Sequence, residues 1–468
     1  MQFKIEMVFH KGKNIPYCKE VKMRKAFWMV VVVVSLVALV FGCAPAPAEK
    51  APAAEEPTPT QGEPIKIAIT GPMTHSSGEQ IWWNCTIAAE EINEAGGVSV
   101  GGVKRPLELV KVDTNELTSV PDAALAIERA ITVNKVDFIV GSWNTEPVLA
   151  MQDVAMDYKK IFITEGAGTP MADRVKEDYE RYKYWFRAYY SSKEAVPYYY
   201  CAIPQFADLV REELGIETPK VAVMMDKAEW VEPMVKAADY FITEAGCENI
   251  GVWRPSTTAT DVSAELLAIK DAGAQIIFHI MYGPSSMVVA KQWDELQIPA
   301  ALVGCNGEAP YDTFMESTHG LGNYLATLAG SSEPVAVTEK TIPFFDKFTQ
   351  KYGEKPQTVW CFFYDAIYRL AEAIERADTL DADALVVELE KTDYIGVMGR
   401  EVWYGPETDD AHGVRMGPEY VITTGAQYQD GELFIIWPPA DGSWHGVSFP
   451  GTVEAELPPW MVEYWKGK

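Results

Sequence analysis

Several polar residues lie where predicted strands run into helices, which is where α/β proteins bind their ligands. The loop 141–145 follows a predicted strand and ends in Thr145, directly before Glu146 and Pro147, as expected of a helix N-cap. The free N–H groups and the positive dipole end of such a helix attract an anion. The loop therefore predicts a carboxylate-binding site, with the alternative that Thr145 only caps its helix.

A second loop of this kind, 165–169, contains Gly166 and Gly168. It lacks the third glycine and the acidic residue of a dinucleotide-binding fingerprint, so its glycines can be ordinary turn residues. Two aromatic residues, Trp230 and Tyr282, follow later predicted strands. We expect both to face a ligand, although ordinary packing would also explain them.

Catalytic and metal-binding motifs are missing from the sequence. It contains no H-E-x-x-H, no G-x-S-x-G and no P-loop, and no two of its six histidines have the spacing of a zinc site. We therefore expect no catalytic residue, no metal and no cofactor.

Cys43 is the most informative reactive residue. It follows basic residues within 22–25, an apolar segment 26–41 and Gly42, which together compose a secretory signal peptide. The apolar run is about 15 residues, short of the roughly 20 that span a bilayer as a helix. We predict that 1–42 is an upstream extension and a signal peptide, with Met23 the more natural start. The alternative is an uncleaved anchor helix.

The segment 43–64 is rich in proline, alanine and glutamate, and such a sequence neither forms a helix nor buries a core. It predicts an extended tether of about 60 Å. The chain is also acidic, with 67 Asp and Glu against 40 Lys and Arg, which argues against binding to nucleic acid or to an anionic membrane surface. The five later cysteines are widely spaced and odd in number, so one disulfide is possible and its pair stays open.

Strands and helices alternate along the rest of the chain. The first predicted set has strands at 65–69, 107–112, 137–141 and 161–164, with helices from about 77 to 95, 121–133 and 146–158. The second set has strands at 221–225, 276–280 and 301–304, with helices at 231–245, 262–271 and 285–296. Alternation of this kind predicts parallel sheets covered on both faces, and two sets predict two lobes.

An ordered series of segments resembles the branched-chain amino acid type of ABC-transporter substrate-binding proteins, over roughly residues 65–440. The similar segments are 67–72, 90–97, 112–114, 260–274, 363–368 and 397–400. The residues before and at Cys43 resemble the lipobox of bacterial lipoproteins, in which the cysteine is acylated and becomes the first mature residue. The resemblance implies the type I periplasmic-binding-protein fold, with two Rossmann-like lobes that have parallel-sheet cores, three hinge crossovers and a ligand in the cleft between the lobes. We expect lobe 1 at 65–188 plus about 330–415, and lobe 2 at 189–329 plus about 416–468.

The same resemblance implies the residues of the ligand site. It places the ligand carboxylate at the loop 141–145, which matches a Ser-rich turn of the family, and at the loop 165–169. It also places an aromatic cover at Trp230 and Tyr282, and an acid for the ammonium group near Asn306. The expected ligand-binding residues are Ser77, Trp143, Asn144, Thr145, Gly166, Ala167, Gly168, Trp230, Tyr282, Asn306 and Glu308.

Two departures from the family pattern bear on the ligand. Asn306 stands where amino-acid binders have a glutamate, and the turn 75–77 lacks the expected tyrosine. An unpaired buried ammonium group binds poorly. Either Glu308 or Glu165 replaces the missing acid, or the ligand is not an amino acid. Several tryptophans suggest a larger or aromatic ligand, although helix tryptophans are more often part of a core.

The expected protein is a monomeric solute receptor of an ABC importer. It is lipid-anchored at the cell membrane, faces the periplasm or cell exterior, and presents a small polar organic solute (an amino acid, an amide or a related carboxylate) to permease subunits. The alternatives are a ligand-sensing lipoprotein that signals to a receptor, and an extracellular hydrolase.

Overall fold

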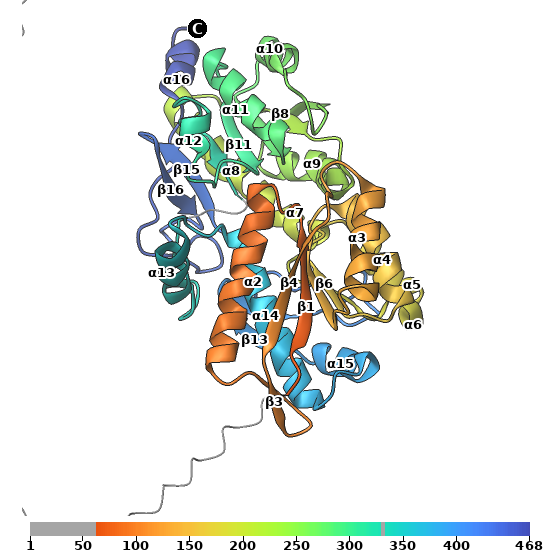
Figure 1. The fold of residues 1–468 in the computed structure, drawn as a ribbon. Helices are drawn as coiled ribbons and strands as arrows, with labels where there is room; N and C mark the ends of the chain where they lie inside the picture. Colours follow the sequence, from red (N-terminus) through yellow and green to blue (C-terminus); the bar gives the residue numbers. More distant parts are fainter. Residues whose placement is uncertain (1–61, 329–332) are drawn as a thin grey trace, which may run out of the picture. The chain divides into compact units, whose positions relative to one another are not determined.

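The computed structural model describes residues 62–328 and 333–468. The predicted signal peptide, Cys43 and nearly all of the predicted tether lie outside these residues. The described part contains two large sheets, each accompanied by helices, and the chain passes from one to the other more than once (Figure 1).

The first sheet is entirely parallel, in the order β4-β1-β5-β6-β7. Its strands are β1 (Ile65–Gly71), β4 (Leu107–Asp113), β5 (Phe138–Gly141), β6 (Phe162–Thr164) and β7 (Trp185–Arg187). The interior strand β1 is buried along almost its whole length, as expected of a parallel strand that has helices on both faces. A short hairpin, β2 (Val98–Val100) and β3 (Val103–Arg105), precedes β4.

The helices of this part connect or cover its strands. They are α2 (Ser76–Glu94), α3 (Val120–Thr132), α4 (Thr145–Asp157), α5 (Pro170–Glu177), α6 (Tyr179–Tyr182), α13 (Thr341–Tyr352), α14 (Thr358–Ala377) and α15 (Ala382–Leu389). Helices α2 and α14, far apart in sequence, pack against each other, and α3 packs against α4 (Figure 1). A small antiparallel pair, β13 (Asp393–Gly396) and β14 (Gly399–Val402), packs near α14.

The second sheet has the order β16-β15-β12-β11-β10-β8-β9. Its parallel strands are β8 (Lys220–Met225), β9 (Glu248–Trp253), β10 (Ile276–Met281), β11 (Ala301–Asn306) and β12 (Ala326–Thr327). Two antiparallel strands from the end of the chain, β15 (Gly425–Gln429) and β16 (Glu432–Trp437), complete one edge. Its helical elements are α7 (Ser192–Tyr200), α8 (Ala202–Leu214), η1 (Glu229–Val231), α9 (Glu232–Glu244), α10 (Ser263–Ala272), α11 (Pro284–Glu295), α12 (Phe314–Ser317) and α16 (Pro459–Lys466).

The chain passes between the two sheets after β7, after β12 and again before β15. The α/β class with two parallel-sheet cores is confirmed, and the predicted strands and helices are present with shifts of one or two residues at their ends. The helix predicted at 231–245 is α9, and a short 3₁₀ turn, Glu229–Val231, leads into it. The exact lobe boundaries stay a prediction.

Several edge strands are absent from the sequence-based prediction. Strand β7 ends in Arg187, and β9 is largely half-buried, so neither shows the continuous apolar run of a central strand. Cys85, Cys201, Cys247, Cys305 and Cys361 are all free, so the possible disulfide is not formed among them. Within 62–328 and 333–468, no helix is both long and apolar enough to cross a membrane.

Candidate functional site

A cavity of about 590 Å³ lies where strands of both sheets end. Residues that follow β1, β4, β5 and β6 line it from the first sheet, and residues that follow β8, β10 and β11 line it from the second. Because parallel strands end at the same edge of their sheet, loops far apart in sequence meet there. The cavity is therefore the candidate ligand site.

Most of the residues predicted from sequence line this cavity. They are Ser77, Trp143, Asn144, Thr145, Ala167, Trp230, Tyr282 and Glu308. The other three predicted residues, Gly166, Gly168 and Asn306, are buried and do not belong to the cavity lining.

The two glycines lie behind the lining because other groups need the space next to them. The guanidinium of the buried Arg187 donates hydrogen bonds to the carbonyl oxygens of Gly166 and Gly168, the latter at 3.0 Å. A Cβ atom at Gly168 would lie 2.4 Å from Cγ2 of Thr145. Close packing, and not contact with a ligand, accounts for these glycines.

Asn306 supports a turn. Its Nδ2 donates to the carbonyl oxygen of Ser286 at 2.8 Å, and its Oδ1 accepts from the N–H groups of Glu308 and Ala309, both at 3.1 Å. Each polar atom of this side chain thus already has a protein partner, and the asparagine holds the turn that carries Glu308 to the cavity.

The predicted carboxylate site contains a carboxylate of the protein itself. Glu116, only 1% exposed, accepts hydrogen bonds through Oε1 from the N–H groups of Trp143 and Asn144, both at 3.0 Å. The Thr114 hydroxyl donates to its Oε2 at 2.7 Å. The hydroxyl of Thr145 in turn accepts from the N–H of Gly168 at 3.2 Å. The loop does attract an anion, as its helix N-terminus predicts, and Glu116 provides it.

Aromatic rings form much of the cavity wall. The Trp143 ring from the first sheet lies 6.2 Å, between centroids, from the Tyr282 ring of the second. Tyr282 also meets Trp230 edge to face, at 5.4 Å and 86°. The Trp143 indole N–H donates to the Ser77 hydroxyl at 3.2 Å, which orients its ring. These contacts join residues of the two sheets around one space.

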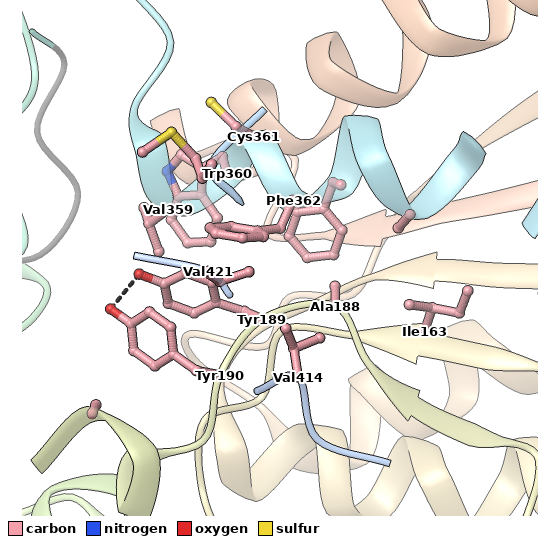
Figure 2. Close-up of a cluster of buried hydrophobic side chains, with 14 of the residues drawn as sticks. Ile163, Ala188, Tyr189, Tyr190, Val359, Trp360, Cys361, Phe362, Val414 and Val421 are labelled. Carbon is pink, nitrogen blue, oxygen red and sulfur yellow. Dashed lines mark hydrogen bonds between the residues drawn. The ribbon is translucent and has the colours of Figure 1, made fainter. Parts of the chain in front are cut away.

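Two further tyrosines come from the first passage between the sheets. Figure 2 shows Tyr189 and Tyr190, whose hydroxyls form a hydrogen bond, beside Trp360 and Phe362 of α14. Tyr189, Tyr190 and Trp360 all line the cavity. The sequence does not reveal them, because the preceding strand β7 ends in Arg187 and follows a charged segment, so no apolar run marks residues 188–191 as following a strand.

Three acids at the cavity have pKa values raised by burial. The pKa of Asp226 rises to about 6, although it accepts hydrogen bonds from the N–H of Tyr282 and the hydroxyl of Ser285. The pKa of Glu308 rises to about 7. The pKa of Glu165 rises to about 8, because burial and the nearby Glu116 outweigh the opposing effect of Arg187. All three acids therefore titrate close to neutral pH.

Positive charge is scarce on the lining. Lys227 is the one lysine or arginine on it among the described residues, and its side chain is exposed. The ring of His75 also lines the cavity, and burial lowers its pKa, so it is neutral at pH 7. No group of three or more His, Cys, Asp or Glu residues within 62–328 and 333–468 is arranged to hold a metal ion.

Comparison with known proteins places the chain. A model of the family described as periplasmic binding protein matches residues 64–418. Leu/Ile/Val-binding protein homolog 7 of Brucella abortus (strain 2308) is 24% identical over 386 residues, which are 80% of this chain and 90% of that protein.

Two solved structures share the fold. One is a branched-chain amino acid transporter substrate binding protein from Streptococcus pneumoniae in complex with isoleucine, with a TM-score of 0.62, 20% identity and coverage of 79% of this chain and 97% of that one. The other is an ABC transporter solute binding protein from R. palustris in complex with benzoate, with a TM-score of 0.61, 15% identity and coverage of 85% and 99%. These matches confirm the type I fold that the sequence predicted. The chain belongs to the periplasmic binding protein family.

Proposed function

We propose that this protein is the extracytoplasmic solute receptor of an ABC importer, which binds a small polar organic solute in its cavity and does no chemistry on it. The observation that carries the proposal is one cavity of about 590 Å³ lined by strand-end residues of two separate sheets. That volume lies within the range of small-molecule sites. The relatives support the same reading, since their names describe binding proteins and transporter components.

Binding between two lobes also gives the protein a way to report its state. A ligand shifts a conformational equilibrium only if it binds one state more tightly. A solute that touches Trp143 on one lobe and Trp230 on the other binds the closed state more tightly. The closed form is then the one that permease subunits recognise. For this purpose we take lobe 1 as 65–188 plus about 330–415, and lobe 2 as the remainder of 189–468.

A ligand screen tests this function. The purified protein should show a raised melting temperature and changed tryptophan fluorescence with at least one class among amino acids, amides, amines and aromatic acids, because Trp143, Trp230 and Trp360 line the cavity. The bound compound should be recovered unchanged after prolonged incubation. Turnover of the compound, or no response to any class, would contradict the proposed function.

A separate prediction concerns the membrane anchor. Acylation needs the Cys43 thiol, so Cys43→Ala should abolish incorporation of labelled palmitate and move the protein from the membrane fraction to the soluble fraction. Cys201→Ala is the matched control and should keep the label, since it removes a free cysteine that lies after the predicted signal peptide. Equal label in wild type and Cys43→Ala would disprove lipid attachment at this residue.

A further inference from the structure

The backbone N–H groups expected to hold a ligand carboxylate are already engaged. Those of Trp143 and Asn144 both donate to Glu116, and that of Gly168 donates to the Thr145 hydroxyl, which keeps its own hydrogen to donate. Glu116 is fully hydrogen-bonded and buried, so a ligand carboxylate would have to displace it or lie beside its negative charge. A second carboxylate at this position would be repelled.

An acid without a partner faces the same cavity. Glu165 is 8% exposed and lines the cavity, and its carboxyl group makes no hydrogen bond and no ion pair with any of the described residues. Arg187 does not neutralise it at close range, because its guanidinium donates to Gly166 and Gly168 and lies 3.8 Å from Asp410. A buried polar group without a partner is costly, so Glu165 is suited to pair with a ligand.

The walls suit the same kind of ligand. Trp143, Trp230 and Tyr282 present aromatic rings around one space, with neighbouring centroids 5.4 and 6.2 Å apart. The face of such a ring attracts a cation, most strongly where water is excluded. Glu308 adds a further acid to the lining, whereas its one lysine, Lys227, is exposed.

From these contacts we propose that the solute is a small organic ammonium ion, recognised by Glu165 and the aromatic rings, and that it needs no carboxylate for binding. The proposal deepens the proposed function and rests on it: the same cavity is used, but the ligand class is an amine. Glu165 supplies the counter-charge, and the rings of Trp143, Trp230 and Tyr282 pack on the carbon atoms around the nitrogen.

Removing Glu116 should recreate the carboxylate site. Glu116→Ala frees the N–H groups of Trp143 and Asn144, so 4-methylpentanoate should bind this variant at least tenfold more tightly than it binds the wild type. Glu116→Gln is the matched comparison: its amide oxygen still accepts from the two N–H groups, so it should gain less than Glu116→Ala, and only from the loss of charge. If a folded Glu116→Ala variant shows no gain, Glu116 does not block a carboxylate. If that variant does not fold, the ligand class is tested by comparing amines, amino acids and carboxylates on the wild-type protein alone.

Matched compounds test the ligand class directly. One set is leucine, 3-methylbutylamine, which lacks only the carboxylate, and 4-methylpentanoate, which lacks only the amine. The other is phenylalanine, 2-phenylethylamine and 3-phenylpropionate. In calorimetry on the full mature chain, at least one amine should bind ten times more tightly or better than its amino acid, and neither carboxylate should bind measurably. An amino acid or a carboxylate that binds more tightly than its amine would overturn the inference and leave the proposed function standing. Binding of uncharged solutes alone would also overturn the inference and leave the proposed function standing. If the protein binds no small solute at all, the proposed function itself is wrong.

Discussion

Glu165→Gln is expected to abolish most of the affinity for an ammonium ligand. Glutamine keeps the size of the side chain and can still hydrogen-bond, but it carries no charge for the ligand nitrogen. Truncating one member of a buried, hydrogen-bonded charge pair costs about 2–5 kcal/mol, which is roughly thirtyfold to several thousandfold in affinity. Calorimetry with 3-methylbutylamine and 2-phenylethylamine would measure the change.

The control for this substitution is Glu128→Gln, which removes the same charge from an exposed position on α3 outside the cavity. It should change affinity by less than twofold, because screening weakens exposed charges at a distance. Equal losses in both variants would mean that net charge, and not contact with Glu165, governs binding.

The same residue predicts how binding depends on pH. A raised pKa of about 8 means that Glu165 holds its proton near neutrality in the unliganded protein. A cation binds the ionised form, so affinity should rise from pH 6 to about 8.5, and binding should release protons. Primary alkylamines stay protonated over this range, as the lysine side chain does. Asp226 and Glu308, with pKa values of about 6 and 7, contribute at the acid end. Arg187 lowers the pKa of Glu165 and Glu116 raises it.

Protein stability should change with pH in the opposite sense. The unfolded chain loses this proton near the ordinary glutamate pKa, whereas the folded chain keeps it up to about pH 8. The stability from Glu165 is thus fully present below about pH 4.5 and is lost as pH rises through about 8. Without ligand, the stability of Glu165→Gln relative to wild type should therefore be higher at pH 8.5 than at pH 5, and at pH 8.5 the variant should be the more stable protein. Thermal melts at both values would show this, and a variant that is less stable at every pH would instead indicate a structural role.

Trp230→Ala is expected to weaken binding of any solute while leaving the fold intact. Trp230 is only half-buried and meets Tyr282 and Tyr199 through ring edges, so it covers the cavity more than it fills a core. Loss of a buried aromatic contact costs about 2–4 kcal/mol, or tenfold to several hundredfold in affinity. Small-angle scattering should show the wild type contracting with its ligand and the variant contracting only at much higher ligand concentration.

Tyr240→Ala is the matched aromatic control, because Tyr240 is 64% exposed on α9 and lies outside the cavity lining. Its affinity should stay within twofold of wild type. If Trp230→Ala binds as tightly as this control, Trp230 does not cover the ligand. If the wild-type radius is unchanged at saturation, binding does not close the lobes.

The sequence by itself determined the class of protein and the order of its elements. Alternating apolar strands and amphipathic helices carry that information locally, because the periodicity of each segment records which face it buries. Residues that follow a recognisably apolar strand, such as Trp143, Trp230 and Tyr282, could be placed at the cavity for the same reason. A strand end is visible in the sequence, and parallel strands end at a common edge.

Only the tertiary structure decided what the polar groups at that edge do. Three residues follow strands as a ligand site requires, but their polar groups bind other parts of the protein. The carbonyl oxygens of Gly166 and Gly168 accept from Arg187, and the N–H of Gly168 donates to Thr145. Asn306 holds the turn around Glu308. The role of Glu116 could not be predicted either. It follows a strand, but nothing in its sequence context indicates that it accepts hydrogen bonds from the N–H groups of Trp143 and Asn144. Hydrogen bonds and burial between residues distant in the chain depend on packing in three dimensions. Whether an anion site stands open or filled, and whether Glu165 is paired or free for a ligand, is therefore decided by the fold.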